Sequence, residues 1–294
     1  MSENSKQHYV HQAYLKLFFT GCKTIHVLNQ SKKIYYTKAY NAINEIACIR
    51  HFYDIEPTHK YEKLFATEFE PKFTQALNNV KDTKKISEED KILLSFYLAF
   101  QILRTPRFRK FLTENIKQIS IDTIDDYLKH NLTDELLKDH KKEYIKCIQN
   151  EPKEHLEVLF TKWIPFATSL FIKNWELMIN QTNIDYITSS EPIYAYGPPH
   201  TGIMNYTTFI FNVTPQISLK VCNEKEFREN IIYSDIYNIS KIKDINKKIA
   251  QRSEYVYCTS KVGVDKLKQY CHSYKDITIE KIQKDNGVIY KSKY

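Results

Sequence analysis

The densest run of apolar positions lies between Ile92 and Leu103, inside the stretch ISEEDKILLSFYLAFQILRTPRFRK that begins at Ile86. Apolar residues in this run occupy nearly every side of a helix, which is typical of a helix buried in a core. The run is too short to cross a bilayer, which takes about 20 residues. It therefore predicts the central helix of a soluble core, capped at Ser87 and stopped or kinked at Pro106.

The segment 61–80 has apolar residues at the spacing of an amphipathic helix. Glu62 and Glu68 fall within or beside its apolar stripe, whereas Glu70 points away from it. A carboxylate on a buried face needs a partner, because an unpaired buried charge is strongly destabilising. The central helix offers Arg104, so we expect a Glu68–Arg104 ion pair.

The rest of the pattern divides the chain into a helical part and a part rich in strands. Further helices are predicted over 8–19, 41–51, 119–150 and 154–171. Strands are predicted as a hairpin over 23–37, as single strands over 175–179, 184–196, 207–213 and 217–221, and as a terminal hairpin over 277–290, with 244–261 and 264–274 helical or mixed. We therefore expect one α+β domain over 1–294: a mainly helical body, about 1–174, with a small antiparallel sheet formed largely by the second half, about 175–294.

Composition narrows the class of protein only slightly. The chain has 43 Lys and Arg against 35 Asp and Glu, a net charge of +8, and 22 tyrosines. This charge is compatible with a nucleic-acid partner, but also with a slightly basic protein of no special surface. With 5 glycines and neither a GxGxxG nor a GxxxxGK[ST] pattern, the sequence argues against the usual phosphate-binding loops.

Cysteine spacing and the N-terminal segment bear on metals and location. The chain has 6 cysteines, no two of them at CxxC spacing, and no histidines at finger spacing from a pair. The segment MSENSKQHYV has no apolar run of signal-peptide length. We expect a cytoplasmic protein with reduced thiols, no metal site, no cofactor and no membrane partner.

Three local patterns carry polar residues that a core does not need. They are HYVHQAYL from His8, QILRTPRFR from Gln101, and YITSSEPI from Tyr186. In this order and spacing they resemble a bacterial family of unknown function whose members open with His-Tyr-Val-Pro-Gln-Phe-Tyr-Leu. That family carries Arg-Thr-Pro at the end of a central helix and Ile-Thr-Ser-Asp-Asn-Pro in a later strand and turn. The resemblance covers roughly 7–260.

The resemblance implies a fold and a set of positions, and it implies that some members serve in phage defence. The present chain departs from the family pattern at several positions. His11 stands where the family has Pro, and Ala13 where it has Phe. Ser190 and Glu191 replace Asp-Asn, so a role of that Asp would pass to Glu191.

The residue types in the three patterns fit metal-independent cleavage of RNA by a defence-type effector nuclease. Histidine exchanges protons near neutral pH, and arginine binds phosphate through two parallel hydrogen bonds. The candidate catalytic residues are His8 as general acid or base, Arg104 as the phosphate ligand, and Glu68 beside Arg104. We expect RNA more than DNA as the nucleic-acid partner.

Five further residues are candidates for substrate binding. Gln12 and Gln101 would position the substrate, Arg107 would hold the phosphate, and Ser189 and Glu191 would line the site from the later strand. Nearby Tyr or Trp rings could stack a base. If cleavage required a metal ion, we would expect Glu62, Glu68 or Glu191 to bind it.

Two alternatives stay open. The same residues could be structural, with Arg104 tying helices together, His8 and Gln12 satisfying buried carbonyls, and Ser189 ending a strand. The chain could also be a non-catalytic module that binds nucleic acid, a nucleotide, or a phage or antitoxin protein. A serine or cysteine hydrolase is disfavoured, because no GxSxG and no cysteine with an evident histidine partner is present.

Overall fold

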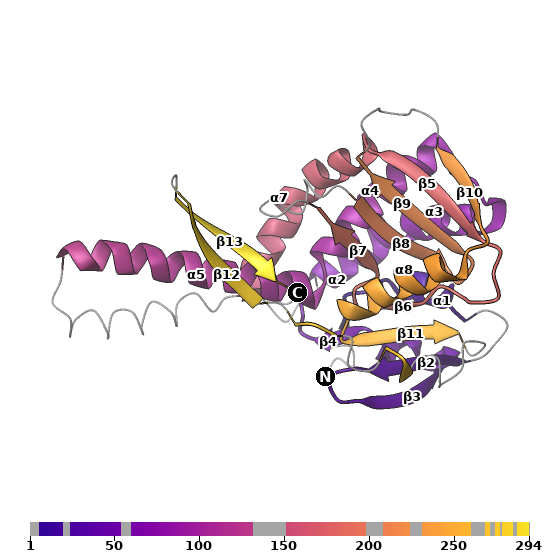
Figure 1. Ribbon diagram of the computed structural model, residues 1–294, viewed down its shortest axis with the longest axis horizontal. Helices are drawn as coiled ribbons and strands as arrows, with labels where there is room; N and C mark the ends of the chain where they lie inside the picture. Colours follow the sequence, from indigo (N-terminus) through magenta and orange to yellow (C-terminus); the bar gives the residue numbers. More distant parts are fainter. Residues whose placement is uncertain are drawn as a thin grey trace.

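The computed structural model describes most of the chain, with gaps (Figure 1). The described residues are 6–19, 24–53, 60–131, 151–197, 208–223, 231–259, 268–270, 274–276, 278–284 and 287–293. Their fold is mixed α+β, as the sequence predicts.

The predicted central helix is confirmed as α4 (Glu88–Leu103). Ser87 caps it through a reciprocal pair of bonds: its hydroxyl accepts a hydrogen bond from the Asp90 amide at 3.0 Å, and the Asp90 carboxylate accepts one from the Ser87 amide. The helix ends before Pro106, which begins α5 (Pro106–Asn131). Proline suits a first helical position because its missing N–H would find no partner there. The prediction that Pro106 stops the helix is therefore confirmed.

The amphipathic segment forms three consecutive pieces rather than one regular helix. They are α2 (Lys60–Leu64), a π-helical turn η2 (Phe65–Phe69) and α3 (Glu70–Thr83). A π turn holds more residues than an α turn, so it shifts the angular position of everything that follows it. This shift matters for the carboxylates considered below.

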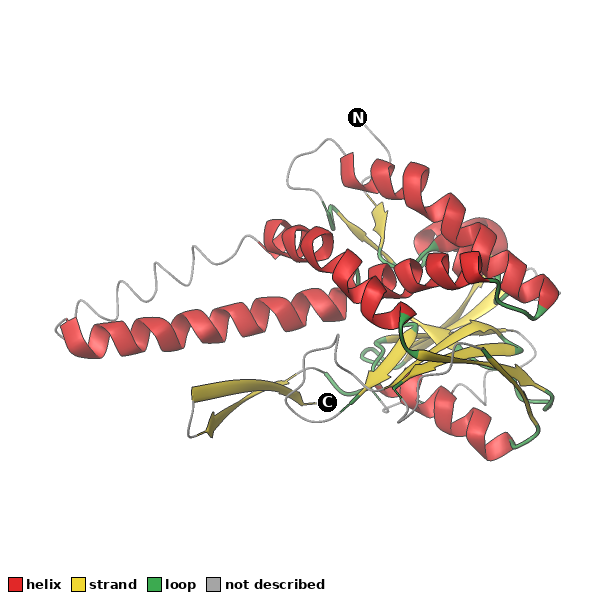
Figure 2. Ribbon diagram, turned by 90° about the horizontal axis from the view of Figure 1, so that it is seen from above, coloured by secondary structure: helices red, strands yellow, loops and turns green. Residues whose placement is uncertain are grey.

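A five-stranded sheet lies between helices (Figure 2). Its order is β10 (Ile232–Ile236), β5 (Asn174–Asn180), β9 (Ile217–Cys222), β8 (Thr208–Thr214) and β7 (Ile193–Tyr196). One face packs on α3, α4 and α7 (Glu151–Phe171), and the other packs on α8 (Ile239–Gln251). The expected antiparallel arrangement holds except for β10, which runs parallel to β5.

A second sheet corrects the expectation that strands belong largely to the second half. Its order is β3 (Ile34–Ala39), β2 (Thr24–Asn29), β11 (Tyr255–Thr259) and β6 (Thr188–Ser189). The N-terminal hairpin is confirmed, but its partner is β11, more than two hundred residues later in the chain. Hydrophobic alternation indicates a strand without indicating its partner, which is why the sequence did not predict this pairing.

The two predicted short helices near the N-terminus are only partly correct. In place of the first, strand β1 (Lys6–His8) leads into α1 (Gln12–Lys16). In place of the second, a 3₁₀ turn η1 (Tyr40–Glu45) is followed by strand β4 (Cys48–Arg50), which pairs with β1. In the second segment, Ala47 has a φ of 52°, a left-handed conformation that interrupts a helix.

The C-terminal half of the predicted layout is confirmed in part. The single strand predicted over 184–196 is wrong, because β6 and β7 are separate strands in different sheets, and β10 was not predicted. Helix α7 covers the predicted 154–171 segment, and the terminal hairpin forms as β12 (Thr278–Lys284) and β13 (Gly287–Lys293). The charged segment predicted over 119–150 is helical to Asn131, and its remainder lies outside the described residues. The same holds for most of 264–274.

Candidate functional site

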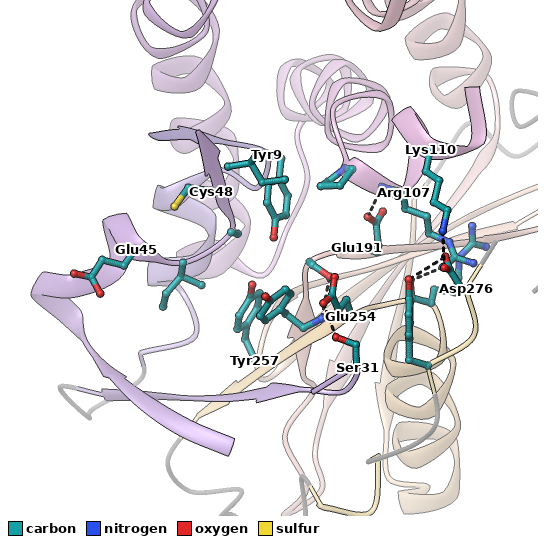
Figure 3. A pocket seen from close by; sticks show the side chains of 18 of the residues that line it. Tyr9, Ser31, Glu45, Cys48, Arg107, Lys110, Glu191, Glu254, Tyr257 and Asp276 are labelled. Carbon is teal, nitrogen blue, oxygen red and sulfur yellow. Dashed lines mark hydrogen bonds and ion pairs between the residues drawn. The ribbon is translucent and has the colours of Figure 1, made fainter. Parts of the chain in front are cut away.

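A pocket of about 540 Å³ opens where the three sequence patterns meet (Figure 3). The first pattern contributes Tyr9, which follows β1. The second contributes Pro106 and Arg107, at the start of α5, and the third contributes Ser190 and Glu191, which follow β6. Five residues from the three patterns therefore share one pocket, but neither His8 nor Arg104, the expected catalytic residues, is among its lining residues.

Glu191 is the most unusual group in the pocket. Its side chain is partly buried, and Oε1 accepts a hydrogen bond from the Arg107 amide in the first turn of α5 at 3.3 Å. Burial raises the pKa of Glu191 from 4.5 to about 7, although Arg107, the Thr105 hydroxyl and Arg252 each act to lower it. Glu191 is therefore a carboxyl that changes charge near neutral pH, which is the property of a general acid or base.

Two arginines adjoin Glu191, and the backbone holds both of them in place. The Nη1 of Arg107 donates hydrogen bonds to the carbonyls of Arg252 and Lys275, each at 3.0 Å. Arg252 ends α8 and donates from its own Nη1 to the carbonyl of Ala195. Such anchoring fixes positive charge beside the pocket before any ligand arrives.

Tyrosines form much of the remaining wall. Those among the lining residues are Tyr9, Tyr36, Tyr255, Tyr257 and Tyr274. Tyr9 and Tyr257 are almost fully buried and hydrogen-bond to each other, and burial raises the pKa of both hydroxyls well above the usual value. These two hydroxyls stay neutral, and the aromatic faces open to a ligand belong to the partly buried Tyr36, Tyr255 and Tyr274.

Further carboxylates make the pocket mixed in charge rather than purely basic. Lys110 pairs with Asp276 at 2.5 Å, and the Ser31 hydroxyl donates to Glu254 at 2.6 Å. Glu45 lines the pocket on the side of η1. A ligand that fits this lining needs both an anionic part and groups that donate hydrogen bonds to carboxylates.

Arg104 does not line this pocket. It is 1% exposed, its Nη1 donates to Glu70 at 2.9 Å, and its Nη2 donates to the carbonyl of His8 at 2.5 Å. Burial alone would raise the pKa of Glu70, but Arg104 and then His11 hold it below the usual value. Arg104 thus joins α3, α4 and β1 through a buried ion pair, and the geometry gives no support to its expected contact with a substrate phosphate.

The expected Glu68–Arg104 pair is wrong, because the partner is Glu70. Glu68 is exposed and accepts a hydrogen bond from Thr67. The π turn η2 lies between the start of the helix and Glu70, so a regular α-helical count assigns Glu70 to the wrong face. No role beside Arg104 is left for Glu68.

His8 and Gln12 form a separate cluster close to Arg104. The Gln12 amide lies 2.8 Å from His8 Nε2, the carbonyl of Asn44 lies 3.2 Å from the same nitrogen, and Glu62 lies 3.7 Å from Nδ1. The structure therefore brings the side chains of His8 and Gln12 together, while Arg104 contacts the backbone carbonyl of His8 rather than its imidazole. None of the three is among the lining residues of the pocket.

Gln101 and Ser189 are buried residues that hydrogen-bond to backbone atoms of pocket residues. Gln101 is fully buried, donates to the carbonyl of Tyr9 at 2.8 Å and accepts from the His11 amide. Ser189, also fully buried, accepts hydrogen bonds from the Ser253 hydroxyl and the Glu191 amide. Both residues hold a pocket segment in place without facing the cavity.

Sequence reasoning missed the lining residues that come from the last third of the chain. Those are Arg252, Glu254, Tyr255, Tyr257, Tyr274 and Asp276. Their only local signal was the alternation of tyrosines in the strand, because their position depends on β11 pairing with β2 and β6.

The part of the chain that the structure describes shows neither a metal-ligand cluster nor a membrane-spanning helix. There, no three His, Cys, Asp or Glu side chains are grouped as metal ligands. No described helix is long and apolar enough to span a bilayer. Cys48, Cys222 and Cys258 are free thiols.

Fold and site together define a mixed α+β protein with a tyrosine-rich, charged pocket at the meeting point of three sequence patterns. Residues 6–261 match the model of a family described as proteins of unknown function, DUF4238, and the chain belongs to this family. The family is thus one without an assigned activity, as the resemblance implied. No curated protein and no solved structure matches the chain.

Proposed function

We propose that the pocket binds a ribonucleotide unit, either free or as a residue of RNA. The observation that carries this proposal is the placement of Glu191 close to two anchored arginines in a pocket lined by several tyrosines. Aromatic faces stack bases, and arginine and lysine neutralise phosphate. The volume of about 540 Å³ lies in the usual range for small-molecule sites.

Each part of a ribonucleotide finds suitable chemistry in the pocket lining. A base would stack against the rings of Tyr36 or Tyr255, which are only partly buried. The phosphate would lie towards Arg107 and Arg252. Glu191, when ionised, would accept a hydrogen bond from a ribose hydroxyl or an exocyclic amine.

A second candidate function is metal-independent cleavage of RNA, favoured by the pKa of Glu191 of about 7. In that reaction the Glu191 carboxylate would take the proton of a ribose 2′-hydroxyl, whose oxygen attacks the adjacent phosphorus. The bond from phosphorus to the 5′-oxygen breaks, and that oxygen takes a proton from water. Arg107 and Arg252 would stabilise the charge that develops on the phosphate.

Glu191→Gln tests both functions against the matched control Glu68→Gln. The control removes an equivalent carboxylate from an exposed position outside the pocket lining. We expect wild type to bind a short oligoribonucleotide in fluorescence anisotropy, Glu191→Gln to bind about tenfold more weakly, and Glu68→Gln to be unchanged. Equal affinity in all three proteins, or no binding by wild type, would overturn the proposal.

The same samples separate binding from catalysis. Incubation of labelled RNA with wild type, with and without EDTA, would show EDTA-resistant cleavage if Glu191 is the acid–base group, and Glu191→Gln would lose it. Binding without cleavage assigns the protein to the non-catalytic class. A cytoplasmic location, a defence role and a phage or antitoxin partner stay predictions.

A further inference from the structure

An aromatic and basic strip lies next to the pocket on β7 and α8. It consists of Tyr194 and Tyr196, two positions apart on β7, together with Lys248 on α8. The two rings are 5.4 Å apart between centroids and tilted by 37°. The Lys248 ammonium lies 6.0 Å from the centroid of Tyr194 and 5.9 Å from that of Tyr196.

Arg252 connects this strip to the pocket. Its guanidinium carbon lies 5.6 Å from the ring centroid of Tyr194, and Arg252 also lines the pocket beside Glu191. Its Nη1 donates to the carbonyl of Ala195, between the two tyrosines. The pocket and the strip therefore share one arginine, which places the strip directly beside the pocket.

The strip is exposed to solvent at Tyr196 and includes one side of a basic helix, α8. Tyr196 is 41% exposed, although a tyrosine ring is a large apolar surface to leave in water. On α8, Lys241, Lys243 and Lys247 are exposed, while Lys248 is partly covered and pairs with Asp244 at 2.7 Å. Exposed aromatic rings flanked by lysines are the two elements with which proteins bind single-stranded nucleic acid.

We propose that this strip binds the nucleotides that continue from the pocket, so that the ligand of the protein is single-stranded RNA rather than a free nucleotide. This inference rests on the proposed function of the pocket. One base stacks on the exposed face of Tyr196, and the backbone phosphates beside it lie near Lys248 and the neighbouring lysines of α8. Duplex RNA is excluded from this arrangement because its bases are already stacked and paired.

The test measures how affinity depends on RNA length. Uridine monophosphate, a uridine trinucleotide and a uridine dodecanucleotide are titrated into wild type and into the double variant Tyr196→Ala, Lys248→Gln. Wild type binds the dodecanucleotide at least about tenfold more tightly than the trinucleotide, since one base–aromatic contact is worth this much. The double variant loses this gain and keeps wild-type affinity for the mononucleotide.

Tyr237→Ala is the matched control, because Tyr237 is 73% exposed and follows β10, at the opposite edge of the same sheet. It retains the full length dependence. Tyr196→Phe also retains it, because the aromatic face is preserved, and circular dichroism confirms that each variant is folded. Raising the salt concentration weakens dodecanucleotide binding less steeply in Lys248→Gln than in wild type, since one phosphate contact is missing.

The outcomes separate the strip from the pocket. Equal wild-type affinity for all three ligands would overturn the proposal that the strip binds RNA, and would leave the proposed function of the pocket standing. A length gain that survives in the double variant, or equally tight binding of duplex RNA, would also overturn it. Dodecanucleotide binding that depends on Tyr196 and Lys248 but not on Glu191 would support RNA binding by the strip and overturn ligand binding by the pocket. If no ligand binds, both proposals are overturned.

Discussion

At the scale of single residues, Glu191 takes its properties from its neighbours. Burial raises the pKa of this carboxyl to about 7, while Arg107 and Arg252 keep it from rising further. The result is a group that can carry or release a proton at neutral pH. Perturbed groups of this kind in a pocket are candidate functional groups, which is why the proposed function is built on Glu191.

The raised pKa predicts a specific dependence of stability on pH. A carboxyl whose pKa is higher in the folded state favours folding when protonated, so its contribution is fully present below about pH 4.5 and is lost as pH rises through about 7. The free energy of unfolding of wild type, relative to that of Glu191→Gln, should therefore fall between about pH 5 and about pH 8. Urea denaturation at several pH values measures this difference, and parallel pH curves for the two proteins would contradict it.

The sequence predicted some site residues and misplaced others for physical reasons. Arg107 and Glu191 were predicted because each follows a clear element boundary, a proline or a strand end, and both lie in the pocket. Arg104 was an equally good candidate from sequence, because a charged residue at a helix end can face either solvent or core. Only the packing of β1 and α3 around Arg104 shows that its side chain faces the core rather than solvent.

At the scale of elements, the π turn η2 decides which carboxylate pairs with Arg104. It places Glu70, not Glu68, against Arg104, and that pair joins α3 to the end of α4 while Arg104 also holds the carbonyl of His8 in β1. The long helices α3 and α4 were predictable from their apolar residues, whereas the two short helices near the N-terminus were not. The π turn was not, because hydrophobic spacing over five residues does not distinguish it from a regular turn.

This arrangement predicts that Arg104→Ala destabilises the fold. The substitution leaves the largely buried Glu70 carboxylate without its main partner, which costs about 3 to 5 kcal/mol in comparable buried pairs. Glu68→Gln should change the free energy of unfolding by less than about 0.5 kcal/mol, since Glu68 is exposed. Chemical denaturation measures both. If Arg104→Ala keeps wild-type stability but loses RNA binding, Arg104 is a binding residue and the structural role given to it here is wrong.

At the scale of the whole molecule, the pocket depends on long-range assembly. Strand β11 joins the N-terminal hairpin to β6 and brings Tyr255 and Tyr257 to the pocket wall, and Tyr274 and Asp276 complete that wall from beyond the region matched by the family. The fold class was predictable because it needs only the number and type of elements. The pocket was predictable only in part, because strand pairing across the chain has no local signal.

The central claim is that one ligand contacts three segments that are far apart in the chain. Hydrogen–deuterium exchange, measured with and without a saturating short oligoribonucleotide, tests it most directly. We predict slower exchange in the peptides that contain Tyr9, Arg107 and Glu191, and unchanged exchange in the peptide around Glu68. Unchanged exchange in those three peptides, or slower exchange confined to other parts of the chain, would contradict the account.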